Sequence, residues 1–300
     1  MARRDQARLF GVLGDPVDHS LSPAMHNAAF AATGLPHLYL RYRVPSAALA
    51  AALREAQALH MGGLNLTAPL KEAVVPLLDA ITPEAERIGA VNTVVFTRAG
   101  GMLGDNGDGR GFLRALRGRV RVRGARVVVV GAGGSARAVT TALAAAGAKR
   151  IVIANRTLAR GEALADRLAR LGAATAAVPL AALAQGQVLE DATLVVNTTA
   201  LGPAGARLPV RYLAAPSRCL FVDLVYGPRA TPFLAGAGRA GRPTLDGAPM
   251  LLHQGVLAFE AWTGRRAPRA TMARALRAAG LALTEPRRAA TLHSRRPPTP

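Results

Sequence analysis

The stretch that most constrains this chain is VVVVGAGGSA, which spans Val127–Ala136. Four consecutive valines predict a strand that is buried on both faces, as strands of a parallel sheet are. A helix over Ser135–Ala146 and a second strand over Ile151–Ala154 would complete a β-α-β unit. The turn between strand and helix matches the pattern G-x-G-x-x-G/A, and its residues of interest are Gly131, Gly133, Gly134, Ser135 and Ala136.

This unit predicts a dinucleotide site, because glycines let the backbone approach a diphosphate at the helix N-terminus. The alternative is a plain strand-to-helix turn. NAD sites usually carry Asp or Glu at the end of the second strand, whereas this chain has Asn155, Arg156 and Thr157, with Arg160 one turn further. A guanidinium pairs well with a 2′-phosphate, so we predict NADP(H). Alternatively, Arg156 is one more surface arginine.

The composition predicts an α/β protein. The chain has 300 residues, of which 50% are hydrophobic, and strands alternate with alanine-rich helices. A net charge of +20 raises the possibility of nucleic-acid binding. We do not favour specific nucleic-acid binding, because the arginines are scattered, aromatic residues make up 4% of the chain and no binding motif is present. A compositional bias toward arginine and alanine explains the charge.

Several other classes are disfavoured. Cys219 is the single cysteine, which predicts no internal disulfide and suits a reducing cytoplasm. The longest uncharged stretch, Leu171–Leu189, contains Pro179 and is a poor membrane span. The apolar run near the N-terminus is too short for a signal peptide. The six histidines show no metal-ligand spacing, so we expect a cytoplasmic protein without metal or membrane contact.

Two residues are candidates for acid–base chemistry. Lys71 and Lys149 are the lysines among 38 basic residues, and a lysine can release a proton near neutrality whereas an arginine cannot. Lys71 lies in the first turn of a short helix predicted to begin at Pro69; the alternative is a solvated surface lysine. Asp108, in the segment DNGDGRG, can accept a hydrogen bond from Lys71 and from a substrate hydroxyl, or cap a helix over Gly109–Leu116.

Polar side chains also gather where predicted elements begin or end. Ser20 and Ser22 lie at a helix start that Pro23 indicates, where two hydroxyls and the helix dipole suit a carboxylate. Alternatively, Ser22 is only the N-cap of that helix. Further polar residues, near predicted strands or on the penultimate helix, are Asn65, Thr67, Asn92, Asn197, Thr198, Asp223, Tyr226 and Gln254.

Nine segments, taken in order over residues 9–284, resemble the shikimate dehydrogenase family. They read GDPVDHSLSPAMHN, GLNLTAPLK, GAVNT, DNGDGRGF, GAGGSARA, NRT, NTTALG, DLVYGPRATP and DGAPMLLHQG. The resemblance implies reduction of 3-dehydroshikimate to shikimate by NADPH, a step of aromatic amino-acid biosynthesis. It also implies a substrate domain made from both chain ends, an inserted Rossmann domain and an active site in the cleft between them.

The resemblance assigns roles to individual residues. It makes Lys71 and Asp108 the catalytic pair. Residues expected to bind the substrate carboxylate are Ser20, Ser22 and Tyr226, and those expected to bind the ring hydroxyls are Asn65, Thr67, Asn92 and Gln254. Residues expected at the cofactor are Gly131, Gly133, Gly134, Ser135, Ala136, Asn155, Arg156, Thr157, Arg160, Asn197, Thr198 and Gly247.

The implied substrate domain comprises residues 1–107 and 243–284, and the implied Rossmann domain comprises residues 108–242. We expect residues 285–300 to form a disordered basic tail, and the protein to be a monomer or homodimer. One position departs from the family pattern, because Gly107 stands where Asn-Thr-Asp-Gly would place a threonine. We expect this change to loosen the interdomain loop or to remove a polar contact.

Two alternative functions remain open at this point. The nearer one is a quinate/shikimate or aminoshikimate-type dehydrogenase, which differs in the pocket around Ser20, Thr67 and Tyr226. The other is a catalytically silent NADP-binding regulator. The presence of both Lys71 and Asp108 argues against the regulator, because a silent protein needs neither of them.

Overall fold

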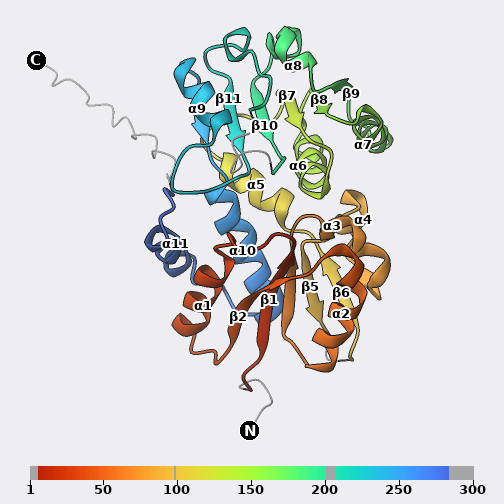
Figure 1. Cartoon of the computed structure of the whole chain (residues 1–300), viewed down its shortest axis with the longest axis vertical. Helices are drawn as coiled ribbons and strands as arrows, with labels where there is room; N and C mark the ends of the chain where they lie inside the picture. Colours follow the sequence, from red (N-terminus) through yellow and green to blue (C-terminus); the bar gives the residue numbers. More distant parts are fainter. Residues whose placement is uncertain (1–5, 98, 201–206, 284–300) are drawn as a thin grey trace, which may run out of the picture.

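The computed structural model describes residues 6–97, 99–200 and 207–283, and it has two lobes, each built on a six-stranded sheet (Figure 1). The predicted α/β class and the second, parallel sheet are confirmed. The expected tail, residues 285–300, lies outside the described residues. Within the described ranges, no helix is long and apolar enough to cross a membrane.

The first sheet is mixed. Strand β1 pairs in parallel with β2 and β3, whereas β5 runs antiparallel to β3 and β6. The parallel part brings the ends of β1 and β3 to the same edge of the sheet, beside the second lobe. The strand order is β2-β1-β3-β5-β6-β4, and the bounds are β1 Leu9–Gly14, β2 Leu38–Arg43, β3 Gly63–Leu66, β4 Ala80–Ile81, β5 Thr93–Phe96 and β6 Met102–Asp105.

Helices from both chain ends cover this sheet. Helix α1 packs against α10 and α11, and the shared core includes Phe10, Phe30, Phe259 and Met272. The C-terminal segment therefore returns to the lobe where the chain began (Figure 1). The helices are α1 Ser22–Ala32, α2 Leu49–Ala58, α3 Leu70–Ala73, α4 Pro83–Ile88, α10 Ala248–Thr263 and α11 Arg269–Ala278, with 3-10 turns η2 Ser46–Ala48 and η3 Val75–Leu77.

The second sheet is parallel throughout, in the order β12-β11-β10-β7-β8-β9. The chain enters at β7, adds β8 and β9 on one side, and then crosses to β10, so the order reverses between β7 and β10. In open α/β sheets, ligands bind at such a switch point. The strands are β7 Arg126–Val130, β8 Arg150–Asn155, β9 Thr175–Pro179, β10 Leu194–Asn197, β11 Leu220–Asp223 and β12 Thr244–Leu245.

Helices lie on both faces of this sheet, and one further helix joins the lobes. Helix α5, Asp108–Leu116, packs against α10 on one side and α6 on the other (Figure 1). Its position makes it the structural link between the sheets. The remaining helices are α6 Gly134–Ala145, α7 Leu158–Arg170, α8 Ala182–Gln185 and α9 Pro232–Arg239, with 3-10 turns η4 Gln187–Leu189 and η5 Tyr212–Ala214.

Two capping predictions are wrong by one position. Ser22 is the first residue of α1 rather than its N-cap, which is Leu21. Asp108 is likewise the first residue of α5, and Gly107 occupies the cap position. Neither cap makes a side-chain hydrogen bond to the helix, so both Ser22 and Asp108 keep their side chains available for other partners.

His26 is an unusual residue in the core of the first lobe. It is fully buried, stacks on Tyr39 with ring centroids 4.6 Å apart, and has no hydrogen-bond partner at either ring nitrogen. Burial lowers the pKa of His26 from 6.5 to about 3. His253 behaves similarly, because partial burial and nearby arginines lower its pKa to about 4. Both imidazoles are therefore neutral in the native protein at neutral pH.

We predict that His26 makes stability depend on pH. As the pH falls below 6.5, the unfolded chain takes up a proton at His26, whereas the native chain does not do so until about pH 3. The free energy of unfolding therefore decreases as the pH is lowered from 6.5 to about 3. The slope is about 1.4 kcal/mol per pH unit for one such group. His26→Leu should reduce the slope between pH 6 and 5 in urea titrations, leaving the parts due to His253 and to His37, whose pKa is also lowered by burial. An unchanged slope would contradict the assignment, and His60→Asn serves as an exposed-histidine control.

Candidate active site

A cavity of about 160 Å³ opens between the two lobes. Its walls come from β1, β3, α3, α5, α6 and α10, so it requires both sheets to be in place. The structure brings all the predicted catalytic and substrate residues together in this one cavity: Lys71, Asp108, Ser20, Ser22, Asn65, Thr67, Asn92, Tyr226 and Gln254. Two of the predicted cofactor residues, Ser135 and Gly247, line it as well.

Lys71 and Asp108 form an ion pair in this cavity. Lys71 Nζ lies 2.7 Å from Asp108 Oδ2, and the two side chains are 13% and 5% exposed. Lys71 Nζ also donates a hydrogen bond to Ser135 Oγ, at 3.0 Å, on the first turn of α6. The lysine on α3 therefore contacts α5 and α6 at once. Its ammonium group lies where the first lobe meets the glycine-rich turn of the second.

Two asparagine amides extend this arrangement. Asn92 Nδ2 donates to Asp108 Oδ1 at 2.7 Å, and lies 3.5 Å from Gln254 Oε1. Asn65 Nδ2 donates to the Asn92 carbonyl oxygen and to Thr93 Oγ1, while Asn65 Oδ1 accepts from the Tyr39 hydroxyl at 2.7 Å. Both amide hydrogens of Asn65 are thus used within the protein. Only acceptor capacity at Oδ1 is left for a ligand.

The opposite end of the cavity suits an anion. Ser20 and Ser22 are both 6% exposed and lie at the start of α1, whose first turn carries no acidic residue. Arg41 Nε donates to the Ser20 carbonyl oxygen, which places a positive charge nearby. Burial raises the pKa of Tyr226, so its hydroxyl remains a donor. Hydroxyls, a helix N-terminus and a guanidinium together favour a carboxylate.

The glycine-rich turn fits a diphosphate. Gly131 has φ of +107°, and a Cβ there would lie 2.6 Å from Thr198 Oγ1. A Cβ on Gly133 would meet nothing closer than Glu72 Oε1 at 4.0 Å, so this backbone faces open space. The first turn of α6 carries no acidic residue, and its N-cap makes no side-chain hydrogen bond. Its N–H groups are therefore available to an anion.

The residues predicted to select the cofactor begin with the last residue of β8, Asn155. Arg156 is exposed, and Asn155 Nδ2 donates to the Thr157 carbonyl oxygen at 2.8 Å. Arg160 NH2 lies 3.6 Å from Glu72 Oε1 in an ion pair that spans the two lobes. Arg137 Nε pairs with the same carboxylate at 3.0 Å. The first turn of α7 carries no acidic residue, and Arg156 and Arg160 lie beside or within it. A helix N-terminus with neighbouring positive charge suits a phosphate.

Three remaining predictions concern residues at the ends of β10 and β12. Asn197 is fully buried, and its amide bonds to Asp223 Oδ1 and to Thr199. Thr198 Oγ1 donates to the Val130 carbonyl oxygen, so it fastens β10 to β7. Gly247 allows a close backbone approach, because a Cβ there would lie 2.0 Å from the Leu224 carbonyl oxygen. These contacts shape the switch point of the sheet.

Sequence reasoning missed His19, which lines the cavity. It also missed two polar residues beside the site, Tyr39 and Thr93. Both are buried, and both bond to Asn65. Thr93 follows Asn92 directly in the segment GAVNT, so its place in this motif could have marked it as a candidate site residue. Nothing in the sequence around Tyr39 distinguishes it from an ordinary strand residue. Among the described residues, no group of three His, Cys, Asp or Glu side chains could hold a metal ion.

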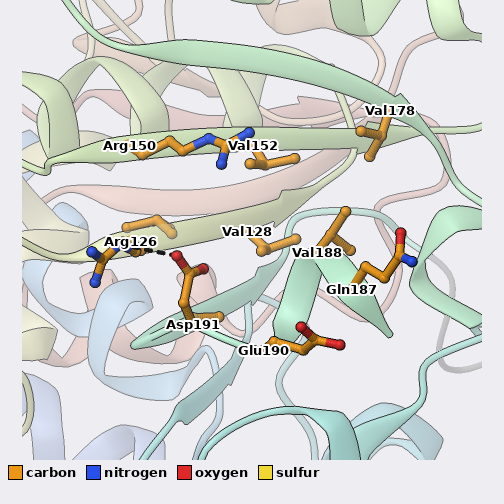
Figure 2. Close-up of a pocket in the computed structure, with 11 residues that line it drawn as sticks. Arg126, Val128, Arg150, Val152, Val178, Gln187, Val188, Glu190 and Asp191 are labelled. Atoms are coloured by element: carbon orange, nitrogen blue, oxygen red, sulfur yellow. Dashed lines mark ion pairs between the residues drawn. The ribbon is translucent and has the colours of Figure 1, made fainter. Parts of the chain in front are cut away.

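A second, larger cavity of about 350 Å³ lies elsewhere on the second lobe. Figure 2 shows its valine floor over β7, β8 and β9, with Arg126 and Asp191 in an ion pair at one side. It lies toward the amino ends of β7 and β8, at Arg126 and Arg150, and contains none of the predicted site residues. Because α/β sites lie at the carboxyl ends of strands, the cavity between the lobes is the candidate active site.

The parallel sheet, its glycine-rich turn and the Lys71–Asp108 pair define a two-lobed Rossmann-type oxidoreductase. Three family models match the chain: the shikimate dehydrogenase substrate binding domain at residues 12–94, shikimate / quinate 5-dehydrogenase at 115–225, and the shikimate 5'-dehydrogenase C-terminal domain at 247–277. The chain belongs to the shikimate dehydrogenase family.

Individual relatives agree with this assignment. Shikimate dehydrogenase (NADP(+)) of Moorella thermoacetica is 48% identical over 90% of this chain and 93% of its own length. The protein of the same name from Methanopyrus kandleri is 47% identical over 88% and 92%. Shikimate 5-dehydrogenase of Thermus thermophilus, solved with NADP(H) and shikimate, is 42% identical, with a TM-score of 0.78 over 91% of this chain and 99% of that one.

Gly107, which departs from the family pattern, yields a stability prediction. Its φ is −89°, and a Cβ there would lie 3.4 Å from the nearest atom, Leu257 Cδ1, which is ordinary contact. Gly107→Ala should therefore raise the free energy of unfolding by about 0.4–1 kcal/mol, because the unfolded chain loses freedom. Gly109→Ala should lower it, because its Cβ would lie 2.7 Å from the Ala138 carbonyl oxygen. Urea denaturation of both variants tests this; equal destabilisation would contradict it.

Proposed function

We propose that this protein catalyses the reversible, NADP-dependent reduction of 3-dehydroshikimate to shikimate. The observation that carries the proposal is the Lys71–Asp108 pair, held at 2.7 Å in a cavity that joins a hydroxyl- and amide-rich lobe to the N-terminus of α6. The identity of the substrate is inferred from the relatives, because the proteins from Moorella and Methanopyrus are named shikimate dehydrogenase (NADP(+)).

Substrate orientation would follow from the two ends of the cavity. Ser20, Ser22 and Tyr226 would bind the carboxylate, since they surround the anion-favouring start of α1. The ring hydroxyls would be bound at the other end by Asn65, Thr67, Asn92 and Gln254. Asn65 would only accept a hydrogen bond there, because both its amide hydrogens are already donated. Such fixed partners reduce the entropy cost of reaching the reactive geometry.

Lys71 would act as the proton donor and acceptor. In the reducing direction, its ammonium donates a proton to the carbonyl oxygen; in the oxidising direction, the neutral amine takes a proton from the hydroxyl. Asp108 holds Lys71 through Oδ2 and accepts a hydrogen bond from a neighbouring substrate hydroxyl. A positioned acid–base group is worth about 10²–10⁴-fold in rate. When bound, the reduced cofactor supplies the hydride for the carbonyl carbon.

The cofactor would lie across the switch point of the second sheet. Its diphosphate would be held by the turn and first residues of α6: Gly131, Gly133, Gly134, Ser135 and Ala136. Its 2′-phosphate would be held by residues at and after the end of β8: Asn155, Arg156, Thr157 and Arg160. Its nicotinamide end would lie near Asn197, Thr198 and Gly247, beside the part of the cavity that Leu224 and Gly247 line.

The proposal extends to the organisation of the enzyme. Residues 1–107 and 243–284 would form the substrate domain and residues 108–242 the cofactor domain, which is supported by the shared core of α1, α10 and α11. The enzyme would work in the cytoplasm as a monomer or homodimer, with Cys219 as a buried free thiol.

The first test offers the purified enzyme shikimate or quinate, each with NADP or NAD, and follows reduced cofactor by near-ultraviolet absorbance. Of the four pairs, we expect only shikimate with NADP to give fast turnover. Comparable turnover with quinate, or a preference for NAD, would make the protein a quinate/shikimate or aminoshikimate-type dehydrogenase. Tight NADP binding without turnover of either compound would instead identify it as a silent regulator.

A second test addresses the 2′-phosphate. Arg156→Asp should lower the ratio of kcat/KM for NADP to that for NAD by roughly tenfold to a hundredfold, because a charge-assisted hydrogen bond is lost and a repulsive charge is introduced. Arg170→Asp makes the same charge change at the last residue of α7, the helix that follows Arg156, and should leave the ratio unchanged. Equal ratios in the wild-type enzyme and Arg156→Asp would place the phosphate contact elsewhere.

A further inference from the structure

We propose that Thr93 is a positioning residue that sets the orientation of the Asn92 amide, and through it the contact between Asp108 and Lys71. The inference rests on the proposed function for its kinetic consequences. Thr93 is the first residue of β5 and is 3% exposed. It does not line the cavity, so any effect on the reaction must pass through its neighbours.

The Thr93 hydroxyl links the two asparagines. It accepts a hydrogen bond from Asn65 Nδ2 at 3.1 Å and donates one to Asn92 Oδ1 at 2.9 Å. The register of the antiparallel pair accounts for this, because β3 and β5 place Asn65 directly opposite Thr93. One hydroxyl thus uses both its donor and an acceptor position on residues that surround the substrate cavity.

The orientation of the Asn92 amide follows from its partners. Asn92 Oδ1 accepts from Thr93 and from the backbone N–H of Gly107, at 2.9 and 3.0 Å. Asn92 Nδ2 is therefore turned toward Asp108 Oδ1, at 2.7 Å. The opposite orientation would place the amide oxygen against the carboxylate of Asp108 and the NH₂ group against the Gly107 N–H. Both contacts would be repulsive, so Asp108 and Gly107 disfavour that orientation, and the Thr93 hydroxyl, which donates to Oδ1, holds the amide in the observed one.

This orientation divides the two oxygens of Asp108 between different partners. Oδ1 accepts from Asn92 and Oδ2 accepts from Lys71, each at 2.7 Å. A carboxylate held at both oxygens has a fixed rotation, which directs Oδ2 at the lysine. Loss of the Thr93 hydroxyl would leave Asn92 with one fewer partner and free the Asp108 carboxylate to rotate. The expected consequence is a misplaced Lys71, because small displacements in an active site have large kinetic effects.

The test compares Thr93→Val, Thr93→Ser and Thr140→Val. Valine keeps the shape of threonine without the hydroxyl, and serine keeps the hydroxyl. Thr140 is the matched control, because it is fully buried and donates only to carbonyl oxygens within its own helix. Each variant is assayed with shikimate and NADP for kcat and both KM values, and its free energy of unfolding is measured in urea.

We expect Thr93→Val to lower kcat by roughly tenfold to a hundredfold with little change in the KM for NADP. Thr93→Ser should restore kcat to within about threefold of the wild type, since it restores the hydroxyl. Thr140→Val should lose stability without losing kcat. Wild-type kcat in Thr93→Val, or no rescue by serine, would overturn the proposal.

A crystal structure of Thr93→Val separates this inference from the proposed function, because it requires no substrate. We expect the Asn92 amide to rotate or the Asp108 carboxylate to move away from Lys71. An unchanged Asn92–Asp108–Lys71 geometry would overturn the positioning role, whatever the enzyme turns over. Wild-type protein that does not oxidise shikimate would instead refute the proposed function, and the crystal structure would still decide the role of Thr93.

Discussion

The ion pair between Lys71 and Asp108 is the interaction on which the rest of the site depends. Two charges that are 13% and 5% exposed have lost most of their water, and a buried pair is tolerated only when further hydrogen bonds satisfy it. The protein supplies these bonds: Asn92 donates to the second oxygen of Asp108, and Lys71 donates to Ser135. The pair is therefore oriented by groups from both sides of the cavity rather than by its own attraction alone.

Helix α5, which carries Asp108, packs closely against its neighbours. Gly109 and Gly111 bring α5 against α6 and α10, because a Cβ at either position would lie within 3.0 Å of backbone atoms. Asp108 at the start of α5 is thereby fixed relative to both lobes. Away from the cavity, Arg167 on α7 donates to the carbonyl oxygens of Glu86 and Arg87 at the end of α4, which is a further contact between the lobes. The cleft is thus bordered by polar contacts between the lobes.

The parts that the sequence could predict are those with local signals. The valine run and glycine-rich turn predicted β7, α6 and β8, and contiguous motifs predicted the residues that line the cavity. The caps of α1 and α5 were misplaced because Leu21 and Gly107 lack the side chains that usually mark a cap. Helix α9 was missed, as was β12, which has only two residues and little periodicity. The Tyr39–Asn65–Thr93 contacts depend on strand register, which single-sequence patterns do not specify.

The most direct test of this account is a double-mutant cycle on kcat with Lys71→Met, Asp108→Asn and the double variant. If the two residues act as one unit, the double variant should lose no more activity than the more damaged single variant. NADP binding, measured by calorimetry, should be retained in all three proteins. Losses that multiply in the double variant would show that Lys71 and Asp108 act independently, and would contradict the central role given to their ion pair.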